Sequence, residues 1–141
     1  MFDLASLDTT PAAEAGAEMK VLHPTSGAVL SQEDGQPIVI TLVGEDSERF
    51  RRASRASLDR RLKRQSAGVS APPSAEELEN NAIETLVACT IGWSGIALDG
   101  KTLDCTPENA RMIYKRLRWL REQVDAFIND RANFLKPSPS T

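Results

Sequence analysis

The chain has 141 residues, 40% of them hydrophobic and 26% charged, and a formal net charge of -3. This length is enough for one compact domain and too short for two, and so small a charge does not by itself select a nucleic acid or a membrane as partner. No apolar run approaches the roughly 18 residues that a membrane-spanning helix needs, and residues 1–20 lack the basic and apolar regions of a secretory signal. We therefore expect one domain that stays in the cytoplasm and makes no membrane contact.

Cysteine and histidine are too scarce to build a metal site. The chain holds two cysteines, Cys89 and Cys105, without CxxC spacing, and His23 is its only histidine. These residues cannot supply the four ligands of a structural zinc site or the pairs of a disulfide framework. We expect no metal and no cofactor, a buried Cys89 inside an apolar helical pattern, a more accessible Cys105 in a loop, and an ordinary polar role for His23.

The first 44 residues divide into an arm and a small sheet. Residues 1–18 show neither helical nor strand periodicity and are expected to form a mobile N-terminal arm. The stretches 19–23 and 38–43 have the composition of strands, and residues 28–30 can add a short third one. Turn-forming residues separate them, which predicts a β-hairpin region over 19–44 with two or three antiparallel strands.

A basic helix is expected over residues 46–64. Asp46 or Ser47 can accept a hydrogen bond from its first free amides, and a thin stripe from Phe50 to Leu62 recurs four residues apart. The stripe predicts a helix on the surface, followed by a Gly/Ser/Pro linker at 65–73. The basic side chains of this helix, here called the basic surface, are Arg49, Arg51, Arg52, Arg55, Arg60, Arg61, Lys63 and Arg64.

Residues 74–135 are expected to form a helical core. Ser74 stands three residues before Glu77, which is the capping-box spacing of a helix start. A broad apolar face opens at Leu78 and continues to Gly92, where this helix is expected to end.

The last helix of the core is expected to begin at Thr106 and Pro107, a cap followed by a first-turn proline. Its apolar pattern continues without a break, which predicts one helix to about residue 133, roughly 40 Å long at 1.5 Å per residue. So long a helix in a small domain is expected to project or to pair with a further copy of the chain. Residues 19–135 thus form one α+β domain, a small N-terminal antiparallel sheet followed by three helices, with a disordered tail at 136–141.

The chain offers little from which to build a catalytic site. His23 has no serine or cysteine nucleophile linked to it by any motif, and paired carboxylates such as Glu76 and Glu77 stand at helix starts, where they favour the helix dipole. The scattered glycines form no phosphate-binding loop. We therefore expect a protein that is not an enzyme.

The basic surface admits two interpretations. It could neutralise phosphates, but no aromatic residue interleaves it to stack on a base, and no helix-turn-helix or zinc pattern surrounds it. The following helix has an acidic first half, so the two helices are electrostatically complementary within a subunit or across a dimer. Helix docking is favoured, and a small nucleic-acid-binding regulator stays open as an alternative. The acidic residues are Glu76, Glu77, Glu79 and Glu84.

The last helix has more apolar surface than one packing partner requires. Met112 and Trp119 lie at the edge of its apolar stripe and widen it, so another chain could use them. Phe134 and Leu135, beyond the regular helix end, either fold back onto the domain or anchor another chain. We predict Met112, Trp119, Phe134 and Leu135 as partner-binding residues, and we expect Trp93 to fill the gap between the last two helices.

A series of short motifs stands in an order seen in one protein family. It comprises Phe2-Asp3-Leu4, Ala15-Gly16-Ala17, His23-Pro24 at a strand end, Gly44-Glu45-Asp46-Ser47 before the basic helix, Trp93, Cys105-Thr106-Pro107-Glu108-Asn109-Ala110 and Arg121-Glu122-Gln123-Val124. In this order of features the chain resembles, over most of its length, the tail assembly chaperones of long-tailed bacteriophages and related prophages.

The resemblance implies a protein of the bacterial host cytoplasm that coats the long, helical tape measure protein before tail tube subunits polymerise around it. The implied partners are the tape measure protein and the tail tube protein. The family carries no catalytic residues, which agrees with the chemistry of this chain. A structural virion component, either a head–tail joining protein or a tail-terminator protein, stays open as an alternative and would remain in the particle as a ring.

Overall fold

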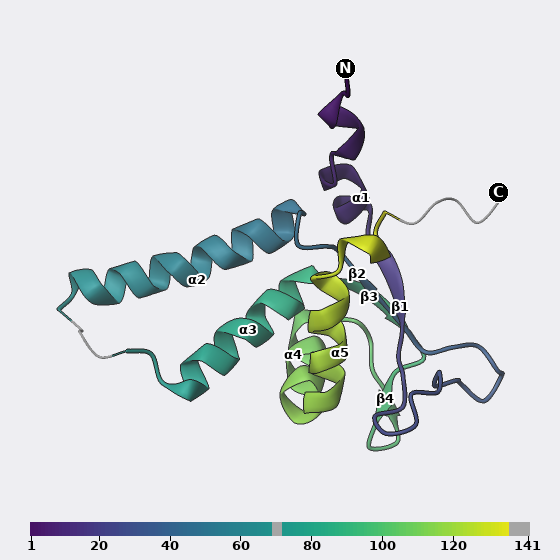
Figure 1. Ribbon diagram of the computed structural model, residues 1–141. Coiled ribbons are helices and arrows are strands. Elements are labelled where there is room, and N and C mark those ends of the chain that lie inside the picture. The colour runs from purple at the N-terminus through teal and green to yellow at the C-terminus, as the bar shows by residue number, and fades with distance from the viewer. Residues whose placement is uncertain (69–71, 136–141) are drawn as a thin grey trace.

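Helices and strands follow one another along the chain as Figure 1 shows. The computed structural model describes residues 1–68 and 72–135; the middle of the predicted linker, 69–71, and the predicted disordered tail, 136–141, lie outside the described residues. The elements are η1 (Leu4–Leu7), α1 (Thr10–Ala15), β1 (Ala17–Lys20), β2 (Val39–Leu42), α2 (Glu48–Ser66), α3 (Ala75–Cys89), β3 (Thr90–Ser94), β4 (Ala97–Leu98), β5 (Lys101–Thr102), α4 (Pro107–Arg116), α5 (Arg118–Ile128) and η2 (Arg131–Asn133). The predicted α+β class with a small antiparallel sheet is confirmed, but the number and order of the helices differ from the predicted layout.

A three-stranded antiparallel sheet in the order β1-β2-β3 forms most of the β structure. β2 is the central strand, and its Ile40 stands opposite Met19 of β1 and Trp93 of β3. Burial alternates along β2, with Ile40 and Leu42 buried, as expected for a strand that turns one face to the core. The stretch 28–30, predicted as a short third strand, forms only an isolated bridge through Val29.

The sequence pattern does not predict β3, because its first residues continue the apolar face of α3. The helix predicted to reach Gly92 ends at Cys89, and the chain then pairs with β2 as a strand. Thr90, Ile91 and Trp93 are β-branched or aromatic, which favours strands over helices. The pairing also gives the second edge of β2 the hydrogen-bond partners that a further turn of α3 would not provide.

The predicted boundary at residue 18 between a mobile arm and the domain is wrong. α1 and the first half of β1 precede it. Ala13 is buried, and its carbonyl accepts a hydrogen bond from the amide of Gly44 at 3.0 Å. Gly16, with a φ of +84°, makes the turn from α1 into β1. A helix of six residues depends on such tertiary contacts, so sequence periodicity does not reveal it.

α2 and α3 form a helical hairpin that extends to one side of the molecule (Figure 1). The predicted basic helix is confirmed, with Ser47 as its N-cap: Ser47 Oγ accepts a hydrogen bond from the Phe50 amide at 3.2 Å. The predicted cap of α3 is confirmed as well, since Ser74 Oγ accepts from the Glu77 amide at 3.1 Å. α3 contributes four residues to the core, whereas α2 has no buried residue. α3 therefore connects the hairpin to the body, and α2 contacts the core through the half-buried Phe50.

The predicted single helix from residue 107 to about residue 133 is wrong. The chain breaks at Leu117, which has φ of -110° and ψ of 86°, and separates α4 from α5. No glycine or proline stands at the break. The turn lets the apolar rows of both helices reach one core, and the Arg121 guanidinium donates a hydrogen bond at 3.4 Å to the Tyr114 carbonyl near the end of α4.

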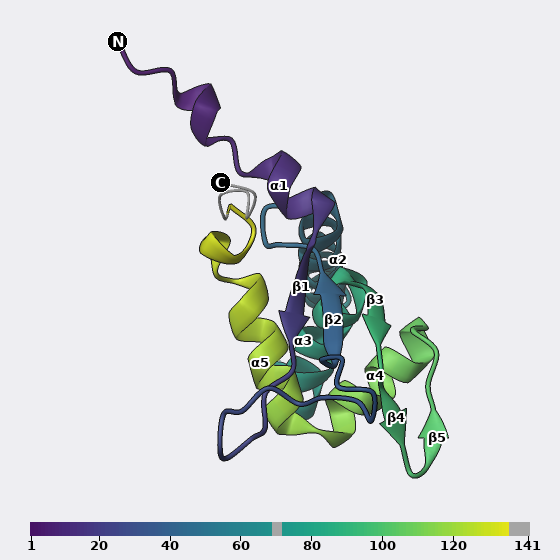
Figure 2. The ribbon, with the colours of Figure 1, turned by 90° about the vertical axis from the view of Figure 1, so that its right-hand side faces the viewer.

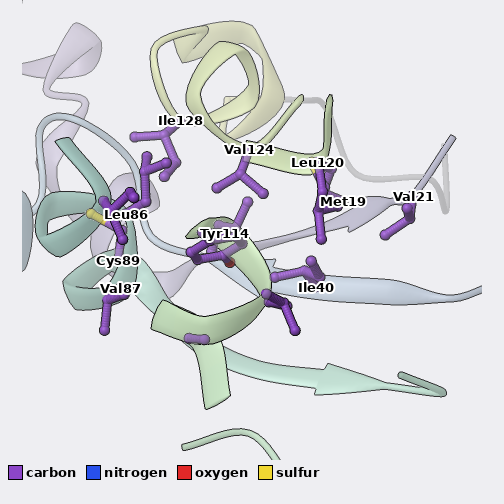
Figure 3. Close-up of a cluster of buried hydrophobic side chains, with 14 of the residues drawn as sticks. Met19, Val21, Ile40, Leu86, Val87, Cys89, Tyr114, Leu120, Val124 and Ile128 are labelled. Carbon is purple, nitrogen blue, oxygen red and sulfur yellow. The ribbon is translucent and has the colours of Figure 1, made fainter. Parts of the chain in front are cut away.

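The core lies between one face of the sheet and the helices α3, α4 and α5. Figure 3 shows its side chains pointing toward one another from these elements. Tyr114 is fully buried at its centre, and its hydroxyl lies 2.7 Å from Thr90 Oγ1 in a hydrogen bond. Burial raises the pKa of Tyr114. The phenol therefore stays neutral, and its one polar atom is satisfied inside the apolar cluster.

Candidate interaction surfaces

The described residues hold no group of three or more His, Cys, Asp or Glu side chains that could bind a metal ion. Cys89 is buried and Cys105 is half-buried, as their sequence contexts predict. Burial raises the pKa of the Cys89 thiol to about 12 and also raises the pKa of Cys105. Both thiols are therefore protonated at neutral pH, where the thiolate is the reactive form.

His23 has a structural role in a turn. Its Nδ1 accepts hydrogen bonds from the Thr25 amide at 3.2 Å and from the Ser26 amide at 3.3 Å. The predicted polar role of His23 is confirmed.

Trp93, predicted to fill the gap between the last two helices, is half-buried against the core. It lies on β3, where its indole Nε1 donates a hydrogen bond to the Leu103 carbonyl at 2.9 Å. The ring packs at the edge of the core and connects the sheet to the segment before α4.

Met112 and Trp119 lie on either side of the break at Leu117. Met112, on α4, is 42% exposed, and Trp119, near the start of α5, is half-buried against the core. In one continuous helix residues seven apart would share a face. The turn at Leu117 removes that alignment, so the two side chains belong to different helices with different directions.

Phe134 and Leu135 lie near the turn between β2 and α2. The Phe134 ring packs edge-on against Phe127, with centroids 5.6 Å apart and planes at 73°. A Cβ added to Gly44 would stand 3.1 Å from Phe134 and from Ala13, which shows how closely the three segments approach. Phe134 therefore folds back onto the domain, while Leu135 stays 47% exposed.

The four predicted partner-binding residues do not form one surface. Trp119 lies in the first turn of α5 and Phe134 beyond its last turn. The 11 residues of α5 span about 16 Å at 1.5 Å per residue. Any client that touches both ends must therefore run along α5.

The basic surface on α2 meets α3 through polar contacts. Arg64 forms an ion pair with Glu77, and Arg60 donates a hydrogen bond to Asn81 Oδ1 at 2.9 Å. The predicted complementarity of the two helices within one subunit is confirmed for this pair only. Glu79 pairs instead with Arg121 of α5, and Glu84 pairs with Arg111 of α4, which lowers the pKa of Glu84. Exposed pairs of this kind stabilise a fold by about 0–1 kcal/mol each.

The helical hairpin also contains a cleft of about 460 Å³, lined by both of its helices and by two prolines before α3. Most of its lining residues are polar or basic types, and two are prolines. The residues are Ser57, Arg60, Arg61, Arg64, Gln65, Pro72, Pro73, Glu77, Asn80 and Asn81.

Apolar side chains stand exposed on the helical hairpin. Leu58 and Leu62 of α2 are 52% and 49% exposed, in agreement with the thin stripe of a surface helix. Leu78, predicted to open the apolar core face of α3, is 48% exposed instead. The first turn of α3 extends beyond the body, so no part of the core packs against its apolar row. The acidic residues Glu76 and Glu77 in this turn are the sequence feature that indicates its exposure.

The largest exposures lie at the N-terminus, where sequence reasoning placed no site. Residues 1–8 are all exposed and are here called the leading segment. The sequence signal that could have identified it is a set of large apolar residues in an otherwise polar arm: Met1, Phe2, Leu4 and Leu7.

Comparisons with protein-family models, with curated proteins and with solved structures find no match for the chain. Among residues 1–68 and 72–135, no helix combines the length and the apolar character needed to cross a membrane.

Proposed function

We propose that the chain is a phage tail assembly chaperone. It binds the tape measure protein in the host bacterial cytoplasm and shields it until tail tube subunits polymerise around it. The observation that carries the proposal is apolar surface left in solvent at the edge of the last two helices. Met112 is 42% exposed on α4, and Trp119 near the start of α5 is only half-buried. Apolar surface without an internal partner is typical of proteins that bind other chains.

The client contacts are proposed on α4 and α5, around Met112 and Trp119. A long amphipathic helix can lay its apolar face on such a surface without a preformed pocket. Each contact is small, because only part of each side chain is exposed. Affinity then comes from several copies that bind along one client. The resemblance supplies the identity of that client, and the tail tube protein is the component that displaces the chaperone.

Substitution of Met112 tests this placement. Met112→Glu places a carboxylate on the proposed contact, and since the side chain is exposed, the fold is expected to tolerate it. We expect co-purification of a co-expressed helical tape measure fragment to fall about tenfold, which corresponds to about 1.4 kcal/mol.

Asn80→Glu is the matched control, because it adds a carboxylate at an exposed position of α3. It should retain the fragment as the unmodified chain does. Equal recovery with Met112→Glu would contradict the contact surface, and an unmodified chain that binds no fragment would contradict the function.

A further inference from the structure

The leading segment is an exposed apolar element without a partner among the described residues. Phe2, Leu4 and Leu7 are 69%, 74% and 62% exposed. Its hydrogen bonds are local, such as the one from the Ala5 amide to Asp3 Oδ1 at 2.9 Å. Side chains three residues apart line up along a 3-10 helix, so Leu4 and Leu7 share one edge of η1. Both ribbon views show the segment pointing away from the body (Figures 1 and 2).

The helical hairpin offers a matching apolar surface. Leu58 and Leu62 stand four residues apart and therefore share one face of α2. The contacts of Arg60 with Asn81 and of Arg64 with Glu77 set the alignment of α2 against α3. These contacts place Leu78 at about the level of Leu62 along the hairpin.

The charges of the leading segment and of α2 are opposite. α2 carries eight basic side chains and only two carboxylates. Six of the eight form no ion pair within the described part of the chain; they are Arg49, Arg51, Arg52, Arg60, Arg61 and Lys63. The leading segment carries Asp3 and Asp8 and no basic side chain.

We infer that the leading segment of one copy docks on the helical hairpin of a second copy. Leu4 and Leu7 pack against Leu58 and Leu62, and the aspartates lie next to free cations of the basic surface. This self-association is separate from client binding and does not rest on it.

A second copy is the occupant because of how the leading segment is held. Thr9 Oγ1 donates a hydrogen bond to Asp46 Oδ2 at 2.6 Å, which fixes the end of the segment beside the turn before α2. From that point the segment runs away from α2 of its own chain (Figure 1). Each copy then presents one leading segment and one hairpin. If two copies dock their leading segments on each other's hairpins, they form a closed dimer. If each copy docks on the next one, they form a longer oligomer.

Two full-length variants with complementary defects test the inference. The first carries Leu4→Ser and Leu7→Ser, and the second carries Leu58→Ser and Leu62→Ser. All four side chains are exposed, so both variants should keep the helix content of the unmodified chain by circular dichroism.

Light scattering after size-exclusion chromatography should show an unmodified chain whose mass rises with concentration. Each variant alone should remain a monomer, because each lacks one half of the contact. A 1:1 mixture should form a heterodimer, because one variant keeps the hairpin and the other keeps the leading segment. An unmodified chain that stays monomeric at every concentration, or a mixture without heterodimer, would overturn the inference.

Charge reversal tests the polar part of the contact. Arg61→Glu with Lys63→Glu should weaken self-association at least tenfold at low salt. Added salt should weaken the self-association of the unmodified chain, because it screens the charges. A chain that also carries Asp3→Lys and Asp8→Lys should regain association. Unchanged association of the variant with Arg61→Glu and Lys63→Glu would overturn the charge pairing. So would a failure of the chain with all four substitutions to regain association.

Discussion

One carboxylate, that of Asp46, joins three parts of the chain. Asp46 Oδ2 accepts hydrogen bonds from Thr9 Oγ1 at 2.6 Å and from Arg131 Nε at 2.7 Å, and Oδ1 accepts from Arg131 Nη2 at 3.0 Å. The residue before α1, the turn before α2 and the start of η2 therefore meet at one side chain. The hydrogen bonds from Arg131 and then from Thr9 lower the pKa of Asp46 from 3.8 to about 2.

This shift predicts an acid dependence of stability that Asp46→Asn removes. Because the folded-state pKa is the lower one, the contribution of Asp46 is complete well above pH 3.8 and is lost as the pH falls through about 2. The difference in unfolding free energy between the unmodified chain and Asp46→Asn should therefore be largest near pH 6 and should shrink between pH 4 and 2. Urea unfolding at several pH values measures it.

Glu18→Gln is a suitable control for the loss of one negative charge, because Glu18 is exposed on β1. A constant difference between the unmodified chain and Asp46→Asn over this pH range would contradict the role given to Asp46.

Single residues of the candidate surfaces could be predicted only where local pattern decides exposure. Met112 lies at the edge of an apolar stripe, and it is exposed as that position implies. Leu78 fits the core row of α3 equally well in sequence, but the body does not extend beneath the first turn. Phe134 follows the last regular helix, so periodicity does not apply there; its contact with Phe127 depends on the tertiary fold.

At the scale of elements, the N-cap of α2 gives the clearest prediction. Ser47 is 1% exposed, and its Oγ accepts a hydrogen bond from the Phe50 amide. Ser47→Ala leaves that amide without its partner and should reduce the unfolding free energy by about 1 kcal/mol. Ser54→Ala, at an exposed position inside the same helix, should be neutral or slightly stabilising. Denaturant unfolding of both variants tests this, and an equal effect of the two substitutions would contradict the cap.

Helix starts could be predicted from the sequence, whereas the path of the chain between helices could not. Caps such as Ser47, Ser74 and Thr106 act within three residues, so their spacing is visible in the chain. The break at Leu117 has no local signal, because the apolar rows on both sides continue one pattern and only the shared core requires the turn. β3 escapes prediction for a similar reason: its hydrogen-bond partner, β2, lies about 50 residues earlier.

At the scale of the whole molecule, a small body carries two exposed elements, the leading segment and the helical hairpin. The leading segment and α2, the outer helix of the hairpin, contribute no buried residue to the core around Tyr114. Both remain free to bind other chains while the domain stays folded. The proposed self-association through these elements and the proposed client binding through α4 and α5 together predict an assembly that grows along the tape measure protein.

The number of copies bound to tape measure fragments of increasing length decides whether this assembly forms. Native mass spectrometry of complexes purified after co-expression gives this number. We expect several copies on each fragment and a number that rises in proportion to fragment length. A fixed number of copies at every length, as a ring-forming virion component would give, or fragments that carry no copy at all, would contradict it.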